Sequence, residues 1–340
     1  MSAELPKTFR NALDDRARQA LVHWGVAEQS PELLKYRENA VFRVRLADGR
    51  PAALRLHRSG YHGEAALRSE LQFMAALAEG GLAVPQPIAS RDGRLLVPLP
   101  HWHAFAAQHA DVIDWVDGES LGESGKPLAQ SPERLVEIFS ALGASMAEMH
   151  NLADRWTPPE GFWRAAWDEE GLIGDRPLWG RFWDCEGLSA AQASALSKLR
   201  LDLSQGLASL PAPARDFGLI HADLVRENVL VEDKAGDMRV KLIDFDDAGY
   251  GYRLFDLATA LLKNRREPAY DVIEAALISG YRSRRNLSDE ALTCLPLFLV
   301  LRSLTYVGWF AERPELSDAR KRVLRYADET LALAAEVGLR

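Results

Sequence analysis

The sequence is poor in cysteine and in long apolar runs. Its two cysteines, Cys185 and Cys294, lie far apart and outside any CxxC pattern. This argues against a zinc site or a disulfide framework and fits a reducing compartment. No apolar run approaches the roughly 20 residues of a membrane-spanning helix, and the polar N-terminus has no apolar core of a signal peptide. We therefore expect a cytoplasmic protein without a membrane partner.

The chain also lacks an excess of positive charge. Its formal net charge is −8, which disfavours a nucleic-acid partner because nonspecific affinity for the phosphate backbone comes from Lys and Arg. Hydrophobic residues make up 47% and charged residues 26% of the chain, as is ordinary for a globular enzyme. A length of 340 residues exceeds what one hydrophobic core usually serves, so two lobes are expected.

The two parts of the chain differ in their secondary-structure patterns. The first part mixes helix with short strands, two of which are joined by an Asp-Gly turn that predicts a hairpin. Its expected helices are 8–24 and 62–79, and its expected strands are 41–46, 51–56, 95–99 and 112–116.

The second part is predominantly helical. Ser131 and Ser189 are expected to begin helices, the first with Pro132 in its first turn. Strand-like runs at 218–231 and 238–245 precede a helical region from about 254 to 336. The sequence therefore predicts an α+β protein with a small antiparallel-sheet lobe over residues 1–116 and a mainly helical lobe over 117–340.

The strongest chemical signal is the pattern H-x-D-x-x-x-x-N, from His221 through Asp223 to Asn228, followed by a strand that runs into Asp244. Carboxylate and amide oxygens suit Mg²⁺, and a carboxylate can orient a hydroxyl group and accept its proton. Either motif alone would fit an ordinary polar turn beside a core strand. Both together, in this order and each next to an apolar strand, favour phosphoryl transfer.

These motifs resemble the catalytic loop and metal-binding motif of the protein-kinase-like superfamily. They are most similar to the phosphotransferase family of aminoglycoside, choline and type II homoserine kinases and bacterial stress-response kinases. The resemblance implies a bilobal kinase fold that binds ATP between its lobes. It also implies Asp223 as the catalytic carboxylate, Asn228 and Asp244 as Mg²⁺ ligands, His221 as a brace of the loop and Asp256 as its tether.

The same resemblance extends to the first lobe. Ala53 and Arg55 occupy one face of a strand, where the family has a small residue beneath adenine and a lysine on the phosphates. Arg55 replaces that lysine, and the two cations are not equivalent. Glu70 lies on the apolar stripe of the next helix, where a carboxylate needs a partner, so we expect it to pair with Arg55. The alternatives are a solvated Arg55 and a boundary position for Glu70.

Two further segments correspond to nucleotide-binding elements of the family. Residues 38–42, which include Glu38 and Asn39, stand where kinases carry the phosphate-covering loop, although Asn39 also fits an ordinary turn residue. Asp114, Trp115 and Val116 correspond to the strand that offers its backbone to adenine. The alternative for this second segment is a strand that merely ends at an Asp-Gly turn.

Departures from protein kinases bear on the phosphate acceptor. Ala222 replaces the arginine of H-R-D, and Asp246 replaces the glycine of D-F-G, so regulation by an activation-loop phosphate is not expected. We predict an ATP- and Mg²⁺-dependent kinase that phosphorylates a hydroxyl of a small, amine-bearing molecule. A protein Ser/Thr kinase of the stress-response type is the first alternative, and a noncatalytic pseudokinase, suggested by Arg55, is the second.

Three features outside the motifs bear on the acceptor and on the core. Asp247 is a candidate partner for an acceptor amine. Five tryptophans between Trp156 and Trp183 either line an acceptor pocket or fasten a loop-rich segment to the helical lobe. His150 continues an apolar helical stripe, and we expect it to be a buried structural histidine.

Overall fold

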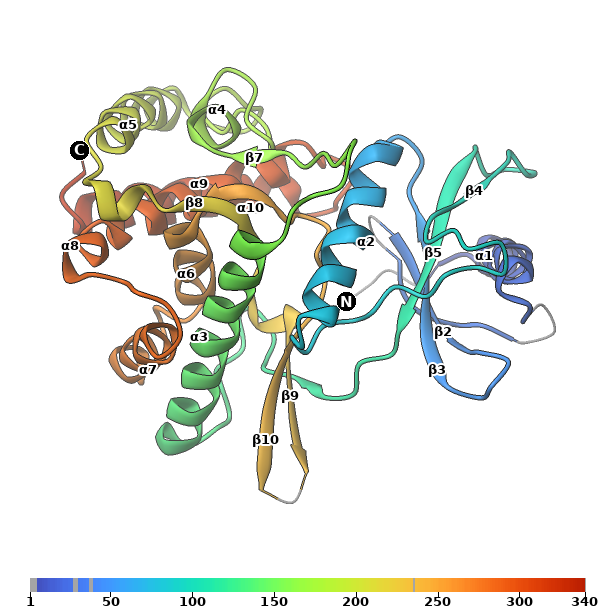
Figure 1. Ribbon diagram of the computed structural model, residues 1–340. Coiled ribbons are helices and arrows are strands. Elements are labelled where there is room, and N and C mark those ends of the chain that lie inside the picture. The colour runs from blue at the N-terminus through green and yellow to red at the C-terminus, as the bar shows by residue number, and fades with distance from the viewer. Residues whose placement is uncertain (1–4, 27–29, 37–38, 235, 340) are drawn as a thin grey trace. The chain divides into compact units, whose positions relative to one another are not determined.

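The computed structural model describes residues 5–26, 30–36, 39–234 and 236–339 (Figure 1). Glu38, part of the predicted phosphate-covering segment, lies outside the described residues. Contacts divide the chain into two compact units, Met1–Asp117 with Thr157–Trp163, and Gly118–Trp156 with Arg164–Arg340. The division into functional lobes at 116/117 stays a prediction. The segment Thr157–Trp163, which the sequence placed in the second part, packs with the first unit.

The first unit is built on a five-stranded sheet with the order β1-β2-β3-β5-β4, in which all neighbouring strands are antiparallel. The strands are β1 (Glu32–Tyr36), β2 (Asn39–Arg45), β3 (Pro51–His57), β4 (Val97–Leu99) and β5 (Gln108–Asp114). The predicted hairpin is formed by β2 and β3. Strand β1 was not predicted, because its side chains are mostly exposed and show no apolar alternation.

The central strand β3 is buried on both faces, and period-two alternation assigns each face a different role. Ala52, Leu54 and Leu56 join the core under helix α1 (Lys7–Leu21), which η1 (Val22–Trp24) extends. Ala53, Arg55 and His57 point to the opposite side. The polar residue Arg55 is thus held inside the first unit by the pleat of a core strand.

Helix α2 (Glu64–Glu79) ends at Gly80, in agreement with the end predicted for the helix 62–79. The last strand, β5, differs from its prediction. It starts four residues earlier than expected, where His109 and Ala110 pair with β4, and it ends at Asp114. Trp115 and Val116 therefore lie beyond the strand.

Helices dominate the second unit, which confirms the predicted α+β class. Helix α3 begins with Ser131, whose side chain accepts a hydrogen bond from the Arg134 N–H, and α5 begins with a capping box formed by Ser189 and Gln192. The helices are α3 (Pro132–Arg155), α4 (Glu169–Ile173), α5 (Ala190–Ala208), η2 (Ala212–Arg215), α6 (Arg253–Leu262), α7 (Tyr270–Arg282), α8 (Asp289–Leu292), α9 (Leu295–Ala311) and α10 (Ala319–Glu336).

Two small sheets complete the second unit. One has the order β10-β9-β6 and the other β7-β11-β8. Their strands are β6 (Glu119–Ser120), β7 (Ala166–Trp167), β8 (Phe217–Ile220), β9 (Val229–Lys234), β10 (Asp237–Leu242) and β11 (Gly249–Tyr252). Helices α3 and α7 approach closely at Gly143 and Gly280, where a Cβ atom would collide with a carbonyl oxygen of the facing helix.

The helical stretch Asp289–Ala311 is apolar, with a mean hydropathy of 1.6 over an 18-residue window. By length and composition it is apolar enough to cross a membrane, which corrects the prediction that no stretch reaches this limit. Within the protein, 67% of that window is buried. Most of the window thus contributes to the core of the second unit.

Candidate active site

The predicted catalytic loop connects β8 to β9 through a short 3-10 turn, η3 (Arg226–Asn228). The Val225 N–H donates to the Asp223 carbonyl at 2.8 Å, and the Asn228 N–H donates to the Val225 carbonyl at 3.0 Å. This curl brings the two polar side chains of the motif together. The Asn228 amide nitrogen Nδ2 donates to Asp223 Oδ2 at 2.8 Å and to the Asp223 carbonyl at 2.9 Å.

His221 braces this loop, as expected. Its Nδ1 accepts a hydrogen bond from the Asp223 N–H at 3.3 Å, so its Nε2 is the donor to the Ile243 carbonyl at 3.0 Å. His221 therefore joins the catalytic loop to the strand that delivers Asp244. The His221 ring also lies against Phe245, with ring centroids 4.5 Å apart.

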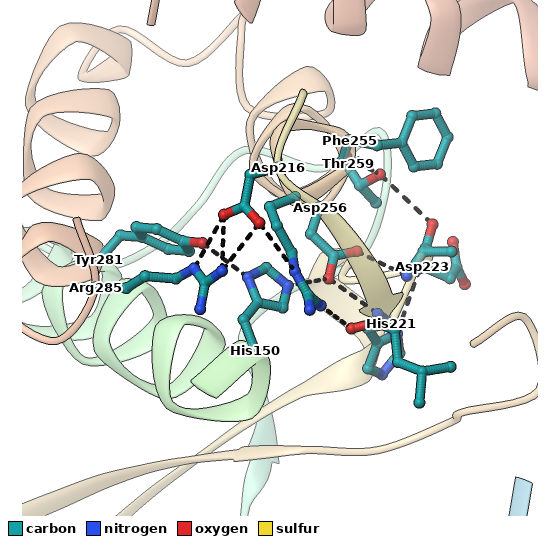
Figure 2. Close-up of polar contacts among 12 residues, drawn as sticks. His150, Asp216, His221, Asp223, Phe255, Asp256, Thr259, Tyr281 and Arg285 are labelled. Atoms are coloured by element: carbon teal, nitrogen blue, oxygen red, sulfur yellow. Dashed lines mark hydrogen bonds and ion pairs between the residues drawn. The ribbon is translucent and has the colours of Figure 1, made fainter. Parts of the chain in front are cut away.

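A buried carboxylate holds the loop from the other side (Figure 2). Asp256, at the start of α6, accepts hydrogen bonds from the His221 N–H at 2.9 Å and the Ala222 N–H at 2.7 Å. The predicted tether is thus confirmed as a contact. His150 supports Asp256 through Nε2 at 3.0 Å and contacts the Tyr281 hydroxyl through Nδ1 at 2.8 Å. His150 is fully buried, which confirms its predicted place in the core.

This arrangement makes the stability of the protein depend on pH through His150. Burial lowers the pKa of His150 to about 4, with the positive charge of Arg253 adding to the shift. A histidine with a depressed pKa stabilises the fold fully above its ordinary pKa of about 6.5 and loses that contribution as the pH falls toward 4. We expect the free energy of unfolding to fall by about 3 kcal/mol across this interval, as measured by urea unfolding.

The variant His150→Gln provides the control for this pH dependence. Glutamine keeps hydrogen-bonding groups but does not titrate, so the slope between pH 6.5 and 4 should become markedly shallower. His101→Gln, at an exposed position, should leave the slope unchanged. An equally steep slope in His150→Gln would show that another group causes the loss of stability.

The backbone is strained at two positions of the motifs. Ala222 and Asp244 have φ values of 65° and 68°, in the left-handed region that residues other than glycine seldom adopt. Such conformations cost of order 1–3 kcal/mol each and persist where the surroundings enforce them. At Ala222 the enforcing contact is the hydrogen bond to Asp256. Nothing in the local sequence predicts this strain.

Carboxylates accumulate around Asp223. Burial raises the pKa of Asp223, and the charge of Asp244 adds to this while Arg302 opposes it. Burial and the nearby carboxylates of Asp223 and Asp246 raise the pKa of Asp247 to about 8. The site therefore has an excess of negative charge that a bound cation would stabilise.

Arg302 makes a contact with Asp223 that the sequence did not suggest. Its Nη2 lies 2.5 Å from Asp223 Oδ1, and its side chain is fully buried on α9. The guanidinium carbon lies 4.8 Å from the Trp179 ring centroid and 4.7 Å from that of Tyr306. Trp179 also donates its indole N–H to Asp247 Oδ1 at 3.2 Å. One tryptophan of the Trp156–Trp183 segment is thus part of the site.

Arg164 is a second residue that sequence reasoning missed. Its buried guanidinium donates to the carbonyl oxygens of Phe245, Asp246 and Ala248, the first at 3.3 Å. It therefore supports the turn that follows Asp244. No motif surrounds Arg164, so only the folded chain reveals this role.

The residues predicted to hold a metal have suitable chemistry. The amide nitrogen of Asn228 is used by Asp223, which leaves its oxygen without a hydrogen bond to any other described residue. The Ile243 N–H donates to the Asn228 carbonyl at 3.0 Å, so Asp244 follows directly after this contact. No group of three or more His, Cys, Asp or Glu in the described ranges is placed to hold a metal. The two oxygens fit Mg²⁺ whose remaining ligands are phosphates or water.

In the first unit, the predicted pair of Arg55 and Glu70 is formed, with Arg55 Nη1 and Glu70 Oε1 2.6 Å apart. The sequence did not predict a second partner, Asp111 on β5, which lies opposite Arg55 in the strand register. Asp111 accepts from Arg55 Nε at 2.8 Å and from Nη2 at 3.0 Å. Burial lowers the pKa of Arg55, but the charges of Asp111 and Glu70 outweigh this and raise it well above its ordinary value.

The other predicted nucleotide-binding residues lie on the same sheet or beside it. Asn39 begins β2 and is half-buried, and Ala53 is buried on β3. The Asp114 N–H already donates to the Gln86 carbonyl at 2.8 Å. The backbone groups of Trp115 and Val116, by contrast, have no hydrogen bond to the described part of the backbone. These groups are therefore better suited to an adenine ring than the Asp114 N–H.

A cavity of about 440 Å³ lies elsewhere in the second unit, and none of the motif residues lines it. Its wall includes Arg253, Arg285 and Tyr281. Tyr281 contacts His150, and His150 in turn contacts Asp256. The cavity therefore borders the residues that support the predicted catalytic loop.

The fold and this arrangement of polar residues define a kinase-like phosphotransferase. Residues 32–287 match the sequence profile of the Phosphotransferase enzyme family, known as APH. The chain belongs to this family. The predicted relationship to aminoglycoside, choline and homoserine kinases is thereby confirmed, and the protein is an enzyme of the kinase type.

The proteins to which this chain is similar are named as kinases of different small molecules. A homoserine kinase from Sinorhizobium medicae is 30% identical over 287 residues, which cover 79% of this chain and 78% of the relative. The structure of a microcompartment-associated aminopropanol kinase is 32% identical, with a TM-score of 0.80 and coverage of 96% of this chain and 98% of the other. Amicoumacin kinase hAmiN, solved with AMP-PNP and Ca²⁺, is 21% identical at a TM-score of 0.76 and covers 96% of both chains, which supports the fold alone.

Proposed function

We propose that this protein is an ATP- and Mg²⁺-dependent kinase that phosphorylates a hydroxyl group of a small, amine-bearing molecule in the cytoplasm. The observation that carries the proposal is the geometry of Asp223. Its Oδ2 accepts from Asn228 at 2.8 Å and its Oδ1 from Arg302 at 2.5 Å. The carboxylate is thereby held in one orientation on a loop that also presents Asn228, as a positioned base requires.

In this mechanism, Asp223 accepts a hydrogen bond from the acceptor hydroxyl and orients its oxygen toward the terminal phosphorus of ATP. As the new O–P bond forms and the bond to the ADP oxygen breaks, the hydroxyl proton passes to Asp223. Both Asp223 oxygens retain a second lone pair, because each accepts one of the two side-chain hydrogen bonds. The strained turn at Ala222 keeps this carboxylate in place.

Mg²⁺ would be held by the Asn228 amide oxygen and the Asp244 carboxylate. When bound, it neutralises charge on the ATP phosphates. The protein itself fixes each of these residues, Asn228 through its hydrogen bond to Asp223 and Asp244 through its left-handed backbone conformation.

In the first unit, Arg55 would bind ATP phosphate through N–H groups that its carboxylate partners leave over. A guanidinium has five N–H groups, and the hydrogen bonds to Asp111 and Glu70 use three of them. Glu70 would fix the direction of this arginine. Ala53, Trp115 and Val116 would contact adenine, with Asp114 at the end of the strand, and Asn39 would contact phosphate.

Asp247 is our candidate for the amine of the acceptor. Of the four carboxylates in this region, Asp223 is paired with Arg302 and Asp244 would be neutralised by the metal. Among the described residues, the Asp247 carboxylate has one side-chain hydrogen-bond partner, the neutral indole N–H of Trp179. The Trp179 ring lies beside the rings of Tyr306 and Trp309. Aromatic faces and a carboxylate together favour an ammonium group. Homoserine and aminopropanol, named for two relatives, both carry an amine and a hydroxyl.

The experiment that tests the function measures ATP consumption with Mg²⁺ against amino alcohols, hydroxy amino acids, sugars and aminoglycosides. We expect turnover with at least one amine-bearing hydroxyl compound, and product analysis should place the phosphate on its oxygen. If phosphate appears instead on the enzyme or on added protein, the alternative of a Ser/Thr kinase replaces the proposal. Failure to consume ATP with any acceptor, together with ATP binding, would favour a pseudokinase.

The metal assignment predicts a change in the requirement for Mg²⁺. In Asp244→Asn, the Mg²⁺ concentration for half-maximal activity should rise by about tenfold or more, because a charged ligand is lost. A magnesium titration at fixed ATP measures this. Asp233→Asn, on the exposed part of β9, is the control and should titrate as the wild type does. An unchanged magnesium requirement in Asp244→Asn would rule out this ligand.

The acceptor assignment predicts a change in KM. Asp247→Asn should raise the KM for an amine-bearing acceptor by about 10- to 100-fold, because a charge-assisted hydrogen bond is lost. The KM for ATP should stay near its wild-type value. The matched comparison uses an amino alcohol and the corresponding diol. Equal losses with both compounds would show that Asp247 does not recognise the amine.

A further inference from the structure

Arg302 differs from Arg226, another buried arginine of the second unit, in how its N–H groups are used. Arg226 donates to Asn264, Glu267 and two carbonyl oxygens, and so ties several segments together. Arg302 Nη2 donates to Asp223 and, at 3.1 Å, to the Tyr306 hydroxyl. Its Nε and Nη1 are buried without a hydrogen-bond partner among the described residues. A structural arginine would be expected to satisfy these groups.

The position of Arg302 is maintained by aromatic rings rather than by further carboxylates. Its guanidinium lies beside Trp179 and Tyr306, at 4.8 and 4.7 Å from the ring centroids, and 5.8 Å from that of Phe255. Tyr306 itself stacks on Tyr326 at 5.2 Å. Such rings stabilise a cation without competing for its charge as a second carboxylate would. Asp223 is therefore the one carboxylate in the described chain within ion-pair distance of Arg302.

We propose that Arg302 is the positioning residue for Asp223, and that Trp179 holds Arg302 and the acceptor-binding Asp247 at the same time. This deepens the proposed function and rests on Asp223 being the base. The Trp179 ring lies beside Arg302, and its indole N–H donates a hydrogen bond to Asp247 Oδ1. The tryptophan-rich segment thereby links recognition of the acceptor to the orientation of the base.

Trp179 makes two contacts that can be tested separately, one through its ring to Arg302 and one through its indole N–H to Asp247. Loss of the Trp179 ring removes the support of Arg302, whereas loss of its N–H alone affects Asp247. Trp179→Phe should therefore raise the acceptor KM with kcat within about threefold of the wild type. Trp179→Leu should in addition lower kcat, because the ring beside the guanidinium is absent.

The decisive experiment is a double-mutant cycle between Arg302 and Asp223, with kcat and both KM values measured for the best acceptor. We expect Arg302→Gln to lower kcat by about 30-fold, the size of a lost charge-assisted hydrogen bond, with the KM for ATP unchanged. Arg302→Lys should recover part of this loss. In the Asp223→Asn background, Arg302→Gln should cost less than about threefold, because the basic carboxylate that Arg302 orients is already gone.

The outcomes separate this inference from the proposed function. If Arg302→Gln costs the same factor with and without Asp223, Arg302 does not act through the base and the inference is overturned. If Asp223→Asn alone retains full activity, the proposed function itself fails. Thermal unfolding of each variant identifies a loss of fold, and Arg302→Lys repeats the test where Arg302→Gln does not fold. Arg313→Gln, which removes an arginine stacked on Trp309, is the control and should leave kcat unchanged.

Discussion

Replacing Asp223 with asparagine should lower kcat by about 1,000-fold, a typical contribution of a positioned general base. Asparagine has nearly the same shape but a single acceptor oxygen, so only one of the two donors, Asn228 Nδ2 or Arg302 Nη2, keeps its hydrogen bond. What is lost is the basic carboxylate that receives the hydroxyl proton. Steady-state kinetics with the best acceptor measure this effect, and the KM for ATP should change little.

The matched control for this substitution is Asp175→Asn. Asp175 is also an aspartate paired with an arginine in the second unit, but its side chain is 90% exposed. Its replacement should leave kcat at the wild-type value. An Asp223→Asn enzyme with kcat within tenfold of the wild type would mean that another group, or water, accepts the proton.

Replacing Arg55 with methionine should destabilise the protein by about 3–5 kcal/mol, the usual cost of breaking a buried ion pair on one side. The substitution keeps much of the side-chain volume but leaves Glu70 without its cation and Asp111 with His57 as its remaining partner. Both carboxylates are buried, with side-chain exposures of 0% and 1%. Denaturant unfolding measures the loss, and a fall in the midpoint without a change in slope would show that two-state unfolding is retained.

Two further variants test this explanation. Arg50→Met lies on the same hairpin, but the Arg50 side chain is 61% exposed, so its loss should cost under about 1 kcal/mol. Adding Glu70→Gln to Arg55→Met should recover part of the stability, because the buried charge left without its cation is removed. If the double variant is less stable than Arg55→Met, the cost does not come from the unpaired carboxylates.

Several parts of the fold and site could be predicted because their signals are local. The Asp-Gly hairpin, the helix starts at Ser131 and Ser189, and the five-residue step from Asp223 to Asn228 all depend on residues near one another in the chain. Turn geometry, helix capping and loop curvature are set by these short-range interactions. The sequence alone therefore predicts these features.

Other parts depend on pairings between distant segments. Asp111 became a partner of Arg55 through the register of β3 and β5, and Arg302 meets Asp223 because α9 packs against α6, which follows the catalytic motifs. Strand β1 exposes most of its side chains, so it carries no apolar pattern to detect.

The class of reaction could thus be predicted from the sequence, since the proposed catalytic loop and metal motif are contiguous stretches whose residue types and spacing already limit what they can do. The surroundings that shift the pKa of Asp223 and orient its carboxylate could not be predicted in this way. Which arginine reaches its carboxylate, which tryptophan supports that arginine, and which carboxylates share a buried region are decided by packing. When a helix that is distant in sequence buries a side chain, the residues next to that side chain in the sequence carry no pattern that indicates the contact.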